Sequence, residues 1–132
     1  MSIVAFGAIA AAVLGLAGYF LWPAVRPTGP VAPGVVVVQM TMEGFSPPRI
    51  EARAGQPITL RLVNKDSPFH TDGGGWHQFA IDELRLDVNV PPETNMEYTF
   101  TPGLSGDYQF YCSVCCGGKE NPYMLGTLAV VA

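Results

Sequence analysis

Short stretches of alternating or β-branched apolar residues recur after residue 34, and they constrain the fold more than any other feature. Residues 35–42, VVVVQMTM, are β-branched and then alternate, and in residues 58–64 the apolar Ile58, Leu60 and Leu62 alternate with other side chains. An alternation of period two places every second side chain on one face of a strand. Further stretches of the same kind are HQFAID, LDVNV, MEYTFTP, DYQFYC and GTLAVVA.

Proline and glycine separate these stretches, in SPP, AGQP, VPPE and TPGLSG. Pro47 and Pro48 precede RIEA and suit the start of an edge strand, because proline cannot donate to a sheet ladder. After residue 34 no stretch carries a long helical apolar stripe. Several short strands with turns every ~8–12 residues predict an all-β sandwich or barrel.

The N-terminal end has a different composition. From Ile3 to Val25 the chain has no charged residue. At about 1.5 Å of rise per residue, a helix of this length can cross a hydrocarbon core of ~30 Å. A secretory signal peptide is the alternative, but nothing basic precedes the apolar run, which is also longer than the usual ~7–15 residues. We therefore expect residues 1–25 to form a retained transmembrane anchor.

The composition changes at Arg26. Residues 26–34, RPTGPVAPG, contain three prolines and two glycines and predict a semi-extended tether. Residues 35–132 then form the folded domain. The net charge of −4 argues against binding to nucleic acid. The sequence also shows no Ser/His/Asp set in a credible frame and no glycine-rich phosphate loop, so it does not indicate an enzyme.

The chemistry is concentrated in residues 111–127, YCSVCCGGKENPYMLGT, which hold all three cysteines but no histidine. Thiolates are soft ligands that select copper or zinc over hard ions. Cys112 and Cys115 have the C-x2-C spacing of zinc sites, but the second half of that pattern is missing. A disulfide between Cys112 and Cys116 in a metal-free domain is the other alternative.

Residues 35–132 resemble a cupredoxin domain, and more narrowly the copper A domain in subunit II of heme-copper oxidases and related nitric oxide reductases. The segments that carry the resemblance are GFSPPRIEARAGQPITLRLVNKD, HQFAIDELRLDVNVPPE, YTFTPGLSGDYQFYCSVCCG and MLGTLAVV. The single N-terminal anchor is similar to that of the one-helix subunit II of B-family oxidases. The resemblance implies a cupredoxin Greek-key β-sandwich preceded by one transmembrane α-helix.

The same resemblance implies most of a copper ligand set. In the copper A loop two cysteines four apart bridge both coppers, and Cys112 and Cys116 keep that spacing. The family pattern gives Val114 the role of a backbone carbonyl ligand. His77, which stands 35 residues before Cys112 in an H-x-F frame, matches the upstream histidine.

The chain departs from the family pattern after the second cysteine. Glu120 occupies the place of the second histidine, and Met124, the expected weak thioether ligand, stands one residue later than the pattern has it. We expect Glu120 to complete the site, with His70 and Cys115 as less favoured substitutes. The cofactor is then copper, in a dinuclear copper A-like site or an altered mononuclear one. Trp76 is a candidate for the residue through which electrons arrive.

The resemblance implies a single-pass subunit of the cytoplasmic membrane, held in the lipid by its anchor, with the cupredoxin domain on the extracytoplasmic (periplasmic) side. It would take electrons from a soluble cytochrome c or small copper protein. It would pass them to a membrane catalytic subunit of the heme-copper type, which reduces oxygen or nitric oxide. Two alternatives come from other classes: a metal-free structural or docking subunit, and a copper chaperone.

Overall fold

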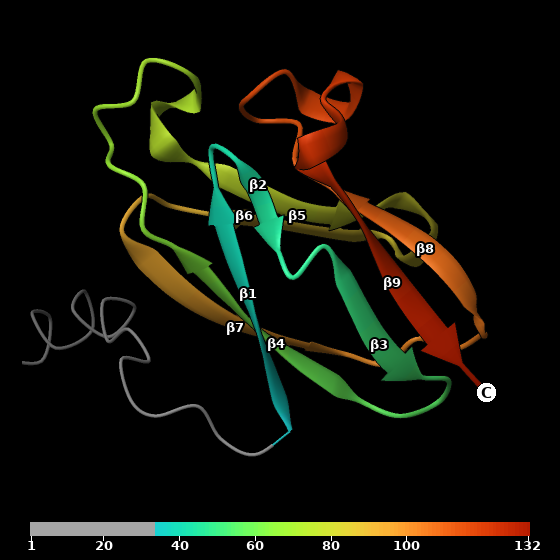
Figure 1. Cartoon of the computed structure of the whole chain (residues 1–132). Coiled ribbons are helices and arrows are strands. Elements are labelled where there is room, and N and C mark those ends of the chain that lie inside the picture. Colours follow the sequence, from blue (N-terminus) through green and yellow to red (C-terminus); the bar gives the residue numbers. More distant parts are fainter. Residues whose placement is uncertain (1–33) are drawn as a thin grey trace, which may run out of the picture.

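The computed structural model describes residues 34–132, in which two β-sheets pack face to face (Figure 1). One sheet has the strand order β2-β1-β4-β7 and the other β3-β9-β8-β5-β6. The architecture is the predicted all-β sandwich. The strands are β1 (Val35–Thr41), β2 (Gly44–Ser46), β3 (Arg49–Arg53), β4 (Ile58–Asn64), β5 (His77–Ile81), β6 (Leu86–Val90), β7 (Thr94–Phe100), β8 (Gly106–Tyr111) and β9 (Leu125–Val131).

The alternation in the sequence located the strands well. Strand β4 has the predicted bounds, and Ile58, Leu60 and Leu62 are buried on one face as expected. Arg61 departs from the pattern, since its side chain is also buried although it lies on the opposite face. Its guanidinium lies 2.6 Å from the carboxylate of Glu97 on β7, and a buried charge needs such a partner. Strand β2 was not predicted, because three residues are too few to show a period.

Two parallel pairings place the functional loops at one end of the sandwich. Strand β1 runs parallel to β4 and β3 runs parallel to β9, while the remaining pairs are antiparallel. The ends of β1, β4 and β8 and the starts of β5 and β9 therefore meet at the same end (Figure 1). The loops at this end, residues 42–43, 65–76 and 112–124, contain the chemistry that the sequence singled out.

Aromatic rings fill the space between the sheets beneath these loops. The rings of Phe79 and Phe110 stack with centroids 4.8 Å apart, and Phe45 meets Phe110 edge-on at 4.9 Å. All five residues of β5 are buried, so this strand and its first residue, His77, are rigidly placed by packing.

The helices among the described residues are single 3-10 turns: η2 (Gly73–Gly75), η3 (Asp82–Leu84), η4 (Gly118–Glu120) and η5 (Pro122–Met124). Within residues 34–132 no helix is long and apolar enough to cross a membrane. The predicted anchor, residues 1–25, and nearly all of the predicted tether lie outside the described residues.

The close packing of Gly126 on β9 gives a test of the sandwich. A Cβ atom at this position would lie 2.1 Å from the Phe110 ring and 2.8 Å from the carbonyl oxygen of Pro48. We predict that Gly126→Ala lowers the free energy of unfolding by about 1–3 kcal/mol, as overpacking of a core does. Gly103→Ala is the matched control, because nothing lies within 4 Å of its added Cβ. Urea unfolding of the two variants measures the difference, and equal stabilities would contradict this packing.

Candidate metal centre

The centre is built around His77, the first residue of β5, whose side chain is only 1% exposed. Its Nε2 lies 2.7 Å from Oδ2 of Asp66 and its Nδ1 faces the cysteines. A carboxylate accepts a hydrogen bond, so Nε2 carries a proton and donates it to Asp66. The other nitrogen, Nδ1, is therefore the one that can bind a metal once it is free of a proton.

Cys112 follows the end of β8 and is completely buried. Its sulfur accepts a hydrogen bond from the backbone N–H of Gln78 at 3.4 Å, and its own N–H donates to the carbonyl of Met124. The Gln78 side chain holds the next residue as well, because its Oε1 accepts from both the N–H and the hydroxyl of Ser113. Strand β5 thus supplies one donor atom and anchors the loop that supplies another.

Cys115 completes a buried group of three metal-binding side chains with His77 and Cys112. Its sulfur lies 3.4 Å from His77 Nδ1 and 3.5 Å from Cys112 Sγ, and Cys112 Sγ lies 3.9 Å from His77 Nδ1. The residue is 4% exposed. Among residues 34–132 this is the only group of three such side chains close enough to share one ion.

Cys116 lies beside this group and is half-buried. Its sulfur is 2.8 Å from Cys115 Sγ and 3.1 Å from the Sδ of Met42, in the turn between β1 and β2. Its φ of 61° is left-handed, and its N–H donates to the carboxylate of Asp72. All three cysteines are free, so no disulfide joins Cys112 to Cys116 in this structure.

Shared protons set the charge state of the thiols. The hydrogen bond from Cys115 lowers the pKa of Cys112 to about 4; burial opposes this shift, and His77 and the N–H of Gln78 support it. The same shared proton raises the pKa of Cys115, and burial raises it further. Burial also raises the pKa of Cys116. Within the Cys112–Cys115 pair the shared proton therefore favours ionisation of Cys112 over that of Cys115.

The pKa of His77 responds to two opposing effects. Burial lowers it, but the hydrogen bonds to Cys112 and Asp66 outweigh burial and raise it overall. A cation that binds at Nδ1 competes with the proton that Nδ1 takes up when the imidazole becomes charged. Metal binding to the centre is therefore expected to weaken as the pH falls.

These residues fit copper by the chemistry of their donor atoms. The group offers one imidazole nitrogen and two sulfurs from residues that are at most 4% exposed, and soft sulfur donors select copper or zinc over hard cations. Zinc accepts the same donor types, but its structural sites use four protein ligands. Copper held by these side chains would exchange one electron; the side chains supply the fixed geometry and exclude water.

The remaining residues of the predicted ligand set lie around this group. Met124 is 1% exposed and contributes its carbonyl to the N–H of Cys112. Val114 is 37% exposed, and its carbonyl oxygen packs closely against Gly73. Glu120 is exposed on η4. No contact between these residues and the His77 group decides their role, so their ligation stays a prediction.

The glycine-rich segment that contains His70 packs against the ligand loop. A Cβ at Gly73, whose φ is +64°, would lie 2.6 Å from the Val114 carbonyl oxygen and 2.9 Å from the Cβ of Cys115. The glycines therefore allow a close backbone approach. His70 itself is exposed. Trp76 is 44% exposed directly before the buried His77, and its proposed role in electron arrival stays a prediction.

Sequence reasoning missed three residues that shape the centre: Met42, Asp66 and Gln78. Asp66 follows Asn64, whose side chain accepts from the Asp66 N–H and donates to the carbonyls of Gly75 and Pro91. In the sequence these residues look like ordinary turn and strand residues. Only the parallel pairing of β1 with β4 brings Met42 and Asp66 together, and no local sequence pattern predicts that pairing.

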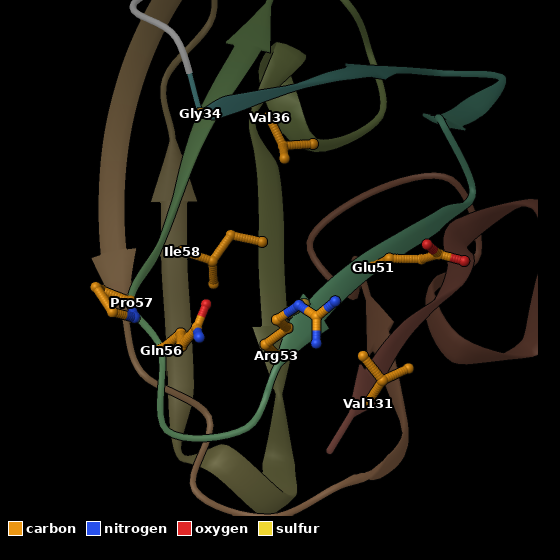
Figure 2. A pocket seen from close by; sticks show the side chains of 9 residues that line it. Gly34, Val36, Glu51, Arg53, Gln56, Pro57, Ile58 and Val131 are labelled. Carbon is orange, nitrogen blue, oxygen red and sulfur yellow. The ribbon is translucent and has the colours of Figure 1, made fainter.

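A hollow of about 320 Å³ lies at the opposite end of the sandwich, near the start of β1 and the end of β9. Figure 2 shows Val36 and Ile58 on one side of it and Arg53 and Val131 on the other. Its lining contains one carboxylate, Glu51, and neither histidine nor cysteine. The hollow therefore does not offer a second soft metal site.

Comparison with known proteins agrees with this fold. The family model for a cupredoxin-like domain matches residues 10–130. The metal-binding domain of the Cu(I)-exporting P-type ATPase CopA of Streptococcus pneumoniae D39, solved with Cu(I), is 17% identical at a TM-score of 0.58, over 78% of this chain and 92% of that chain. Auracyanin B is 15% identical at 0.57, over 80% and 94%.

The periplasmic domain of cytochrome oxidase subunit II (CoxB) of Bradyrhizobium japonicum is 15% identical at a TM-score of 0.57, over 77% of this chain and 86% of that chain. At these identities the likeness establishes the fold alone. No curated protein matches the chain.

The contact between Asp66 and His77 gives a test of the centre. We predict that Asp66→Asn weakens copper binding by about 10–100-fold, because the neutral amide no longer fixes the tautomer and basicity of the imidazole. Asp107→Asn is the control, since Asp107 pairs with Arg49 on the surface. Competition with a copper chelator measures the affinity. Equal affinities in the two variants would show that Asp66 does not orient a metal ligand.

Proposed function

Because the chain belongs to the cupredoxin-like domain family, we propose that it is a membrane-anchored copper electron-transfer subunit. In this proposal residues 1–25 cross the cytoplasmic membrane and the cupredoxin domain lies on the extracytoplasmic side. The domain receives electrons from a soluble cytochrome c or small copper protein. It passes them to a membrane catalytic subunit of the heme-copper type, which reduces oxygen or nitric oxide.

One observation carries this proposal: the residues His77, Cys112 and Cys115 are enclosed, at 1%, 0% and 4% exposure. A catalytic metal site keeps an open position for its substrate, whereas an enclosed set of ligands suits electron transfer. Electrons can pass through packed protein where a substrate cannot. The fold shared with a cytochrome oxidase subunit II domain supports the proposal without identifying the partner.

A second candidate function is the carriage of Cu(I). The presence of Cys115 in the central group favours it, because a thiol-rich set with a single imidazole stabilises the softer, reduced ion. One structural neighbour was solved as a Cu(I)-bound metal-binding domain of a copper exporter. A metal-free docking subunit is the remaining alternative.

Loading the full chain with copper distinguishes electron transfer, copper carriage and a metal-free docking role. We expect a coloured Cu(II) state that is reduced and reoxidised by one electron per centre without loss of copper, and Cys112→Ser is expected to abolish the colour. Ser46→Ala, at an exposed serine, serves as the unaffected control. A centre that holds Cu(I) only and releases it to an acceptor would favour carriage instead. A chain that binds no copper would leave the docking role.

Acidic side chains around the centre predict a basic electron donor. Asp72 and Asp82 contact the ligand loop, at the N–H of Cys116 and the ammonium of Lys119, and Glu83 follows Asp82 on the surface. Opposite charges raise association rates at low salt, and ions screen this attraction.

We therefore predict that Glu83→Lys lowers the rate of reduction by a basic cytochrome c several-fold at low ionic strength and hardly at all near 1 M salt, where the screening length falls to ~3 Å. Glu51→Lys, at the far end of the sandwich, is the matched control. Stopped-flow kinetics measure the rate. If the rate depends neither on the salt concentration nor on either substitution, the donor is not a basic protein that binds through these charges.

A further inference from the structure

Sulfur atoms extend beyond the central group toward the surface. Cys115 Sγ lies 3.5 Å from Cys112 Sγ on one side and 2.8 Å from Cys116 Sγ on the other. Cys116 Sγ in turn lies 3.1 Å from Met42 Sδ. Cys115 is therefore one of the two inner sulfurs in a continuous row of four that ends at the thioether of Met42.

We propose that the centre binds two Cu(I) ions that share the thiolate of Cys115. The inner ion is held by His77, Cys112 and Cys115, and the outer ion by Cys115, Cys116 and Met42. The proposal rests on the proposed function only in requiring copper at the inner position. It assigns a role to Met42, a residue that no loop pattern indicated.

The spacing of the sulfurs accommodates such a pair after a small adjustment. With metal–sulfur bonds of about 2.3 Å, two sulfurs on one three-coordinate ion stand about 4 Å apart. The contact between Cys112 and Cys115 is close to that value, while those of Cys116 must widen by about 1 Å. Cys116 and Met42 are half-buried where they pack against the core, and methionine is unbranched and adaptable, so the Met42 side chain can follow this movement.

The charge balance also permits a second ion. When the three thiols bind copper, each exchanges its S–H bond for a sulfur–copper bond and releases its proton to solvent. With one Cu(I) at the inner position, Cys116 keeps its proton, and the two inner thiolates with their ion carry one net negative charge. The second Cu(I) replaces the proton of Cys116, so the complete set also carries one net negative charge, and the second ion adds no further unpaired charge to the site.

Both halves of the row are held by the same carboxylate. Oδ2 of Asp66 accepts from His77 Nε2 at 2.7 Å and from the backbone N–H of Met42 at 3.0 Å. The first bond orients an inner ligand and the second fixes the turn that carries an outer one. Cys116 is fixed separately, by the hydrogen bond from its N–H to Asp72. The backbone that carries the outer donors is thus held in place without metal.

The test measures how many Cu(I) ions the full chain binds under anaerobic, reducing conditions, in competition with a chromophoric Cu(I) chelator. We expect two per chain. Met42→Leu, which keeps the volume and removes the thioether, is expected to retain the inner ion and to weaken the outer one at least tenfold. Met96→Leu is the matched control, because Met96 is a partly buried methionine packed against the core from β7. Its binding is expected to remain at two.

Two further variants keep the test decisive. Cys116→Ser is expected to leave one ion and to remove the copper–copper scattering from the X-ray absorption spectrum, while Cys115→Ser weakens both ions. Glu120→Gln and Met124→Leu, at two residues of the predicted ligand set, show whether the second ion uses these side chains in place of Met42. Circular dichroism confirms that each variant is folded.

The outcomes separate the failure of this inference from that of the proposed function. A wild-type chain that binds one ion, or a Met42→Leu chain that binds two with unchanged affinity, overturns the outer site and leaves copper binding intact. The same holds if Glu120→Gln or Met124→Leu, rather than Met42→Leu, removes the second ion. A wild-type chain that binds no copper overturns the proposed function itself.

Discussion

The centre depends on one carboxylate oxygen. Oδ2 of Asp66 accepts hydrogen bonds from the imidazole of His77 and from the N–H of Met42, and so joins the β4–β5 loop to the start of β5 and to the β1–β2 turn. Its own place is set by Asn64, which ties the same loop to the carbonyls of Gly75 and Pro91. Without this bond the imidazole would lose its preferred tautomer, and Nδ1 would no longer be directed at the sulfurs.

The strand pattern was readable from the sequence because half-buried strands alternate. Residues 58–64 matched β4 at both ends, and β6 and the whole of β5 were also located. The three-residue β2 was missed for lack of a period. Arg61 lies on the face opposite Leu60 and Leu62, as the alternation requires. Its burial was not readable, because its partner, Glu97, stands 36 residues away and is brought close only by the β4–β7 pairing.

The part of the site that follows the spacing of residues along the sequence could be predicted. The loop after β8 and the upstream His77 were identified, and the structure brings His77 and Cys112 together. Sequence reasoning ranked Cys115 low, because family resemblance assigns ligands by position in the loop. The structure instead turns the loop with a left-handed residue at Cys116 and packs it against Gly73, so that Cys115 faces the imidazole. Such a turn depends on contacts between distant loops.

The inner and outer donors differ in exposure to solvent, and this difference helps to decide between electron transfer and copper carriage. His77, Cys112 and Cys115 are nearly inaccessible, whereas Cys116 and Met42 are half-buried. An ion at the inner position can leave only if the loop opens, because its donors have no surface on which a second protein could compete. An ion at the outer position meets solvent and can pass to competing thiols directly.

Transfer of copper to another protein would therefore use the outer donors, whereas the inner donors would retain their ion. A carrier needs only the first property and an electron-transfer centre needs only the second. The inner donors are the ones held by the buried strand β5, by Gln78 and by Asp66. These contacts therefore favour retention of the inner ion. That distribution is why electron transfer is the function the structure supports best, even with a thiol-rich donor set.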